Sequence, residues 1–203
     1  MRGGGGRVAA LTLSLLVVGC TTSPPSDVNN ICDIFEEKDD WYDDAEDSRK
    51  RWGSPVPVMM AIMHQESRFR AKAKPERKKI LWVIPGPRKS NSYGYTQALK
   101  ETWEVYQRDA GNYGADRDDF GDSIDFIGWY NHQSYRRSGI KKDDPYHLYL
   151  AYHEGWGGFN KRSFKNKQWL KEVAKKVSRK SAAYTRQLQG CEEDLKDDGW
   201  WFW

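Results

Sequence analysis

Residues 54–69 read Ser-Pro-Val-Pro-Val-Met-Met-Ala-Ile-Met-His-Gln-Glu-Ser-Arg-Phe, and this stretch decides the fold. Ser54 is a residue type that caps helices, and Pro55 and Pro57 follow in a first turn, where a missing amide donor does no harm. The apolar side chains fall on two neighbouring stripes of such a helix, so little of its surface can face water. The first stripe holds Val58, Ile62 and Phe69, and the second holds Met59 and Met63. We therefore predict a buried helix at the centre of the fold.

Glu66 stands near the end of this apolar helix. Burial disfavours the charged form of a carboxyl, and so does the negative end of the helix dipole, so both effects raise its pKa. A carboxyl that keeps its proton near neutral pH can act as a general acid. The alternative is a solvated residue at a helix end that pairs with Arg70, which would lower the pKa. The pattern alone leaves both interpretations open.

The first residues have the layout of a secretory signal, with Arg2 and Arg7, an apolar run over 8–18, and then Gly19 and Cys20. The run is about half of the ~20 apolar residues that a helix needs to cross a bilayer. We predict that residues 1–19 are a signal peptide and not the mature anchor.

The sequence Val17-Val18-Gly19-Cys20 resembles the lipobox of bacterial lipoproteins. The resemblance implies cleavage before Cys20 and acylation of that residue, and several acyl chains give stable anchoring to a membrane. The residue after the cysteine is Thr21 and not Asp. In the Gram-negative version of this family, that implies sorting to the outer membrane, with the protein facing the periplasm. Residues 20–30 are polar and form the expected lipidated tether. The alternative is an ordinary signal peptide with an incidental cysteine.

With Cys20 assigned to lipid, Cys32 and Cys191 remain. In an oxidising compartment a disulfide between them is the economical interpretation, although two unlinked thiols are also compatible with the sequence.

Length and charge favour one domain without a nucleic-acid partner. The 203 residues suit a single domain, expected over 31–195, with an acidic and aromatic tail over 196–203. Without Arg2 and Arg7, 31 basic side chains face 29 acidic ones, a net charge of +2. Nothing in that balance points to nucleic acid.

Apolar spacing predicts a mainly α fold with a small β-strand or hairpin element after the central helix. An amphipathic helix is expected over 31–52, ended by Gly53. A short strand over 80–84 is expected to enter a turn at Pro85-Gly86-Pro87. Further helices are expected over 98–109, 124–136, 146–152 and 169–188.

Three short motifs follow one another at a characteristic spacing. They are Glu66-Ser67-Arg68-Phe69, Gly94-Tyr95-Thr96-Gln97 and Ala151-Tyr152-His153-Glu154-Gly155. Their order resembles the soluble lytic transglycosylase family of lysozyme-like peptidoglycan enzymes, which shows a Glu-Ser pair, then Gly-Leu-Met-Gln, then Ala-Tyr-Asn with a nearby Gly. The resemblance covers roughly residues 52–158 and implies an α+β lysozyme-like fold.

The resemblance also implies roles for single residues. Glu66 is the expected catalytic acid and base, Gln97 is expected to line the saccharide groove, and the Tyr152 hydroxyl to hydrogen-bond near the catalytic carboxyl. Substrate contacts are further expected from Ser67, Gly94, Tyr95 and His153. Tyr95-Thr96 replaces Leu-Met and should reshape the groove wall, while His153 replaces Asn. Ser90 and Ser92 are candidates for the serine that positions the substrate acetamido group.

The implied chemistry needs a single carboxyl, because the substrate supplies both nucleophiles. The family cleaves between N-acetylmuramic acid and N-acetylglucosamine and leaves a 1,6-anhydromuramyl end. The expected partners are peptidoglycan glycan strands and, through the lipid, a membrane. No cofactor is expected, and no metal site either, because His64, His132, His147 and His153 lack a recognisable ligand spacing.

Two alternatives remain at this stage. Ordinary glycosidases use two carboxyls, so a hydrolytic muramidase would need Glu154, Asp118, Asp119 or Asp122 as the second. A glycan-binding lipoprotein without activity is the other. Stacking on sugar rings is one role for the tryptophans, but the spacing of Trp41, Trp52 and Trp169 favours core positions.

Overall fold

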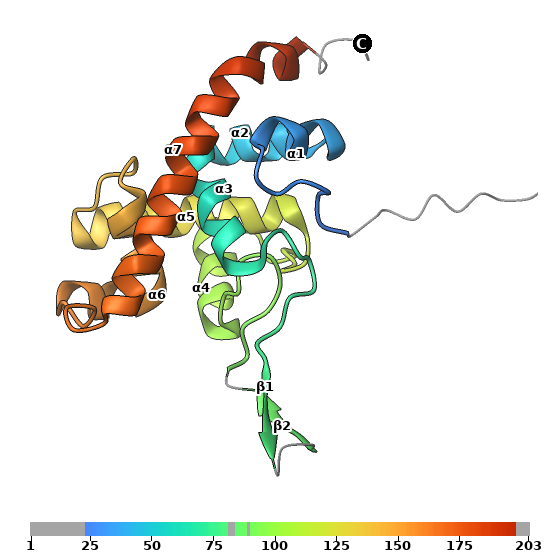
Figure 1. Ribbon diagram of the computed structural model, residues 1–203. Coiled ribbons are helices and arrows are strands. Elements are labelled where there is room, and N and C mark those ends of the chain that lie inside the picture. The colour runs from blue at the N-terminus through green and yellow to red at the C-terminus, as the bar shows by residue number, and fades with distance from the viewer. Residues whose placement is uncertain (1–22, 81–83, 89, 198–203) are drawn as a thin grey trace, which may run out of the picture.

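The computed structural model describes residues 23–80, 84–88 and 90–197. Helices make up most of this part of the chain, and a strand pair projects from the helical body (Figure 1). The fold is therefore mainly α, as the sequence predicts. The elements are α1 (Ile31–Glu37), α2 (Trp41–Trp52), α3 (Val56–Ser67), β1 (Arg77–Ile80), β2 (Ile84–Arg88), α4 (Lys100–Ala110), α5 (Phe120–Ser138), α6 (Pro145–Asn160) and α7 (Gln168–Asp197).

Helix α3 is the buried centre of the fold, and it contacts α2, α5, α6 and α7. Its side chains from Val58 to Met63 are all buried, so the predicted central helix is present. The predicted cap is wrong, however. Pro55 occupies the N-cap position without a side-chain hydrogen bond, and the buried Ser54 hydroxyl instead accepts a hydrogen bond of 2.9 Å from the Asn131 amide on α5.

The helix expected over 31–52 is two helices, α1 and α2, with a break between them. The Glu37 carboxylate at the end of α1 accepts two hydrogen bonds of 2.7 Å from Ser26, which fold the preceding segment back. Across the break, Phe35 of α1 and Tyr42 of α2 meet edge to face, with their ring centroids 5.4 Å apart. Gly53 ends α2 in the left-handed conformation with a φ of 72°, as expected for a C-terminal glycine.

Helix α5 begins at Phe120, earlier than the expected residue 124, because the Asp119 carboxylate caps it by accepting the Asp122 amide at 2.9 Å. Helix α6 also exceeds its expected range of 146–152. It continues past a kink at Gly155, whose φ of 70° interrupts the helical backbone. Gly155 therefore separates two helical segments, and the first segment ends at the glycines as predicted.

Strands β1 and β2 pair antiparallel, with Ile80 opposite Ile84. The single strand expected over 80–84 is therefore wrong, because these two residues belong to different strands. Pro85-Gly86-Pro87 lies inside β2 and not in a turn. Residues 81–83, between the strands, lie outside the described residues.

Helix α7 packs across α3, α6 and α1 and continues to Asp197, so residues 196 and 197 belong to it. The disulfide expected between Cys32 and Cys191 joins α1 to α7 across 159 positions of sequence. The expected core position of Trp169 is wrong, since 57% of this residue is exposed at the start of α7. No helix among the described residues is long and apolar enough to cross a membrane.

Candidate active site

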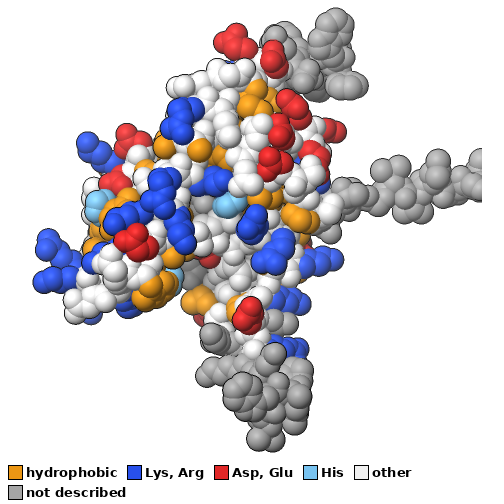
Figure 2. Space-filling view, in the orientation of Figure 1, with side chains coloured by type: hydrophobic (Ala, Val, Ile, Leu, Met, Phe, Trp, Pro, Cys, Tyr) orange, Lys and Arg blue, Asp and Glu red, His pale blue; other side chains and the backbone are white. Residues whose placement is uncertain are grey.

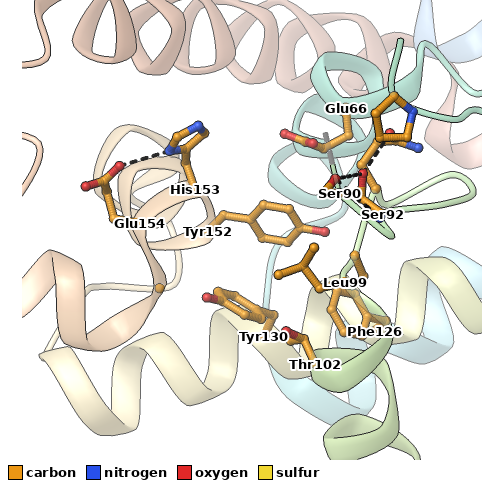
Figure 3. Close-up of a pocket in the computed structure, with 14 residues that line it drawn as sticks. Glu66, Ser90, Ser92, Leu99, Thr102, Phe126, Tyr130, Tyr152, His153 and Glu154 are labelled. Atoms are coloured by element: carbon orange, nitrogen blue, oxygen red, sulfur yellow. Dashed lines mark hydrogen bonds and ion pairs between the residues drawn. The ribbon is translucent and has the colours of Figure 1, made fainter. Parts of the chain in front are cut away.

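A cleft of about 630 Å³ opens beside the end of α3. Its walls come from α3, from the segment between β2 and α4, from α5 and from α6 (Figure 3). The lining residues are Glu66, Pro75, Ser90, Ser92, Gln97, Ala98, Leu99, Thr102, Phe126, Tyr130, Tyr152, His153, Glu154 and Gly155. The structure thus brings all three sequence motifs to one cavity.

Glu66 reaches the cleft because α3 ends immediately after it. Ser67 is the last helical residue, and Arg68 follows in the left-handed conformation, with its backbone N–H donating to the His64 carbonyl. The preceding turns of α3 are buried, so the helix delivers a carboxyl from the core into the cavity. Glu66 itself is partly buried.

Burial raises the pKa of Glu66 from the ordinary value of 4.5 to about 7, and a hydrogen bond from Tyr149 opposes this rise in part. Removal from water disfavours the anion, which is the direction predicted from the sequence. The rival pairing with Arg70 is not made, because the Arg70 Nε donates to the Ser67 carbonyl at 2.9 Å. Among the described residues, no ion pair involves Glu66.

Two tyrosines of α6 stand against this carboxyl. Burial and the neighbouring charge of Glu66 raise the pKa of Tyr149 and Tyr152 well above the ordinary value of 10, so both hydroxyls keep their protons. The Tyr152 hydroxyl donates to the Thr96 carbonyl at 2.8 Å. Sequence analysis missed Tyr149, although it lies three positions before Tyr152 and so shares its helix face.

Gln97 lines the cleft in a backbone conformation that few side chains adopt, with a φ of 50°. Its amide nitrogen donates to the carbonyls of Ala73 at 3.0 Å and Gly94 at 2.9 Å. Its amide oxygen accepts from Ser92 at 3.3 Å, and the Ser90 hydroxyl donates to Ser92 at 3.1 Å. Both candidate serines are therefore joined to Gln97 in one wall.

Three of the predicted contact residues do not line the cavity. Ser67 is buried and donates to the Met63 carbonyl at 3.4 Å. Tyr95 points into the core, where it meets Trp41 at 5.8 Å. Gly94 has a φ of 78°, and a Cβ there would lie 1.8 Å from the Arg117 carbonyl oxygen. A glycine is therefore required here by the close approach of the two backbone segments.

Glu154 lines the cleft but its carboxylate is already bound. Lys167 Nζ lies 2.8 Å away, His153 Nδ1 lies 3.0 Å away, and the Ser163 hydroxyl also donates to it. These partners lower the pKa of Glu154 to about 2 against the opposing effect of burial. In Figure 3 Glu154 lies beyond Tyr152 as seen from Glu66.

The other candidate carboxylates lie outside the cleft lining. Asp118 accepts from the Tyr93 hydroxyl at 2.9 Å, Asp119 caps α5, and Asp122 accepts from Asn112 at 2.9 Å. No group of histidine, cysteine or carboxylate side chains in the described part of the chain could hold a metal ion. Of the two carboxyls that line the cleft, Glu154 is bound by charged partners, whereas Glu66 has a raised pKa and stands among aromatic and polar side chains.

Comparison with protein families gives one match. A family model described as "Transglycosylase SLT domain" matches residues 8–191, which is most of the chain. No curated protein matches the chain. Proteins with this domain act on the peptidoglycan of the cell envelope, so the match supports a transglycosylase-type function on that polymer.

Proposed function

Because the chain belongs to the transglycosylase SLT domain family, we propose that it is a peptidoglycan lytic transglycosylase with Glu66 as its single acid and base. It cleaves the β-1,4 linkage between N-acetylmuramic acid and N-acetylglucosamine and leaves a 1,6-anhydro end on the muramic acid. The observation that carries this proposal is the Glu66 carboxyl, which lines the cleft with a pKa raised to about 7.

In the first step, protonated Glu66 donates its proton to the glycosidic oxygen. The bond from that oxygen to C1 of muramic acid breaks, and the acetamido oxygen of the same sugar bonds to C1. N-acetylglucosamine leaves with a free 4-hydroxyl. The raised pKa supports this step, because a general acid must still hold its proton at the working pH.

In the second step, the C6 hydroxyl of the muramic acid attacks C1, and its proton passes to the Glu66 carboxylate. The acetamido oxygen departs, the 1,6-anhydro ring closes, and Glu66 returns to its starting form. No water is consumed. Because both nucleophiles belong to the bound sugar, the attack gains from proximity, for which effective molarities reach ~10⁵ M or more.

The cleft walls fit a sugar chain. Phe126 and Tyr130 are buried, whereas Tyr152 is the partly buried aromatic residue of the lining, and its ring offers a flat apolar face for a sugar ring. Gln97, Ser90 and Ser92 supply hydroxyl and amide groups to the wall. We assign the acetamido contact to this polar wall.

The muramidase alternative requires a second carboxylate that is free to attack C1 or to activate water. Glu154 lines the cleft, but its two oxygens are bound by Lys167 and Ser163. The aspartates considered as alternatives face other parts of the molecule. This arrangement favours internal attack over hydrolysis.

Borohydride labelling of digested sacculi tests the proposal. Hydrolysis creates new reducing ends that take up label, whereas transglycosylation creates anhydro ends that do not. We expect soluble fragments without new reducing ends. Stoichiometric labelling would establish a muramidase, and binding without release of fragments would establish a glycan-binding protein.

We also propose that Cys20 is acylated and anchors the enzyme to the outer membrane. The motif ending at Cys20 supports this, but it lies outside the described residues, which begin with the tether at residue 23. Metabolic labelling with a radioactive fatty acid should mark the wild-type chain, and Cys20→Ala should remove the label.

A further inference from the structure

A basic segment connects the end of α3 to the cleft. Residues 68–74 read Arg-Phe-Arg-Ala-Lys-Ala-Lys, so cations alternate with apolar residues and no carboxylate interrupts them. Phe69 and Ala71 are buried, whereas the four cations are exposed. The alternation therefore turns Arg68, Arg70, Lys72 and Lys74 outward together.

These cations have no carboxylate partner among the described residues. Arg70 donates to the Ser67 carbonyl, and Lys74 lies over the Tyr93 ring at 5.2 Å. Surface cations elsewhere in the molecule do form ion pairs, for example Lys50 with Asp47 at 2.9 Å. Positive charge is thus left uncompensated along this segment, and Figure 2 shows Lys and Arg side chains following the chain from α3 toward the hairpin.

A partly buried neighbour responds to the same positive charge. The pKa of His64 is lowered to about 4, by burial first and then by the charges of Lys180 and Arg68. Lys180 belongs to α7, where the charge of Asp27 acts on it as well. An anion that approaches this surface meets several cations at once.

The segment also forms a cavity of its own. Arg70, Lys72 and Lys74 line a hollow of about 370 Å³ with Pro24, Ala71 and Ala73. The next residue, Pro75, lines the cleft that holds Glu66. The Ala73 carbonyl accepts the Gln97 amide at 3.0 Å and the Gly94 backbone N–H at 3.0 Å. The basic hollow is therefore joined to the cleft wall through the Ala73 carbonyl.

We propose that this basic hollow binds the carboxylates of the peptide stems of peptidoglycan, so that the enzyme prefers peptide-bearing strands over peptide-free ones. This inference rests on the proposed function, because it takes a glycan strand to lie in the cleft. A peptide stem is attached to the lactyl group of muramic acid and carries free carboxylates several bonds from the sugar. The stem therefore extends away from the glycan strand, and the basic hollow adjoins the cleft in sequence at Ala73, Lys74 and Pro75.

A second anion source is the lactyl carboxylate itself, which becomes free when the peptide is removed. That group stays close to the sugar ring, and none of the four cations is among the residues that line the cleft. The geometry therefore favours the stem, and the two sources can be told apart by the substrate.

The test compares two substrates prepared from the same sacculi, one with its peptide stems and one stripped by an amidase. For Lys72→Gln with Lys74→Gln, kcat/KM on peptide-bearing strands should fall about tenfold at low salt, as expected for the loss of charge-assisted contacts. The change on stripped strands should be much smaller. The wild-type preference should also shrink as salt rises, because exposed charges are screened over about 10 Å at 0.1 M.

Two controls complete the design. Lys72→Arg with Lys74→Arg keeps the charge and should retain the preference. Arg136→Gln with Lys141→Gln removes the same charge from exposed positions outside both cavities and should leave both activities unchanged. Thermal melting of each variant identifies any loss of folding.

An equal loss on both substrates, or no loss on either, would overturn the inference. The proposed function fails differently, because the wild type would then yield no anhydro ends from either substrate. In that event, sedimentation with intact sacculi still tests the basic hollow: the glutamine variant must bind peptide-bearing sacculi more weakly than the wild type, or the inference is wrong.

Discussion

Glu66 carries its carboxyl at the junction of core and cleft, where burial raises its pKa to about 7. The sequence predicts this direction, because the helix that carries Glu66 near its end is apolar on two stripes. The sequence also predicts that Gln97 and Tyr152 belong to the site, and both line the cavity. It does not predict where Tyr95 points, because the turn through Gly94 and the left-handed Gln97 sends the Tyr95 side chain into the core.

The activity should depend on the protonated form of Glu66. We expect kcat/KM to fall as pH rises through about 7, since the general acid then loses its proton. Rates of release from sacculi between pH 5 and pH 9, measured at fixed ionic strength, would show this descending limb. A rate that stays level up to pH 9 would contradict the assignment.

A variant at Tyr149 tests whether this descending limb belongs to Glu66. The Tyr149 hydrogen bond lowers the pKa of Glu66, so Tyr149→Phe should move the descending limb to higher pH. Tyr113→Phe, at an exposed position outside the cleft, should leave the limb where it is.

The raised pKa of Glu66 also has a consequence for stability. Ionisation of Glu66 is harder in the folded protein than in the unfolded chain, whose carboxyl keeps the ordinary value of 4.5. The free energy of unfolding is unaffected below pH 4.5, falls as pH rises from 4.5 to about 7, and stays lowered above that. Glu66→Gln has no such ionisation, so the variant should be more stable than the wild type at pH 8.

The size of this difference follows from the shift. Each pKa unit corresponds to about 1.4 kcal/mol, and solvent in the open cleft reduces the full value, so we expect about 1 to 2 kcal/mol at pH 8. Urea unfolding at pH 8 and at pH 4.5 measures it. The two proteins should converge at the lower pH, and a wild type that is the more stable at pH 8 would refute the explanation.

At the scale of elements, helix positions follow from apolar spacing, but their ends depend on single contacts that spacing does not contain. The break between α1 and α2 depends on Ser26 folding back onto Glu37. The early start of α5 depends on the Asp119 cap. Gly155 interrupts the helical backbone where the glycines predict its end, but a second helical segment then continues to Asn160. Each of these is a local hydrogen bond or backbone conformation that outweighs the pattern.

The Glu154 carboxylate ties the kinked end of α6 to the residues that lead into α7, through Ser163 and Lys167. Glu154→Gln removes the charge that holds Lys167, so stability should fall by about 1 to 3 kcal/mol, as for other hydrogen bonds to charged groups. Activity at 20 °C should stay within a few-fold of wild type, because this carboxylate takes no part in the proposed reaction.

Thermal melting and kcat/KM on sacculi, measured on the same Glu154→Gln sample, separate the two roles. A loss of a thousandfold or more in activity with the fold intact would restore the muramidase alternative.

At the scale of the whole molecule, one disulfide joins the first helix to the last across 159 positions. Its existence could be predicted from the cysteine count and the expected compartment, while the way α7 crosses the centre of the fold could not. The packing of α7 on α3 depends on the complementary shapes of both helix surfaces. A short sequence pattern contains no information on that complementarity.

Cys32→Ser with Cys191→Ser should therefore lower the free energy of unfolding by about 3 to 5 kcal/mol, since the unfolded chain regains the freedom of a long loop. Neither cysteine lines the cleft, so activity well below the melting temperature should be kept. Urea unfolding of the oxidised wild type and the double variant provides the comparison. An unchanged midpoint would show that the bridge does not constrain the chain.

The central claim is that Glu66 alone moves one proton while the substrate attacks itself, and mass spectrometry of muropeptides released in H₂¹⁸O tests it most directly. The wild type should release anhydro ends that carry no ¹⁸O, and Glu66→Gln should bind sacculi but release essentially nothing. Fragments with ¹⁸O in their new ends, or anhydro ends released at an equal rate by Glu66→Gln, would contradict the claim.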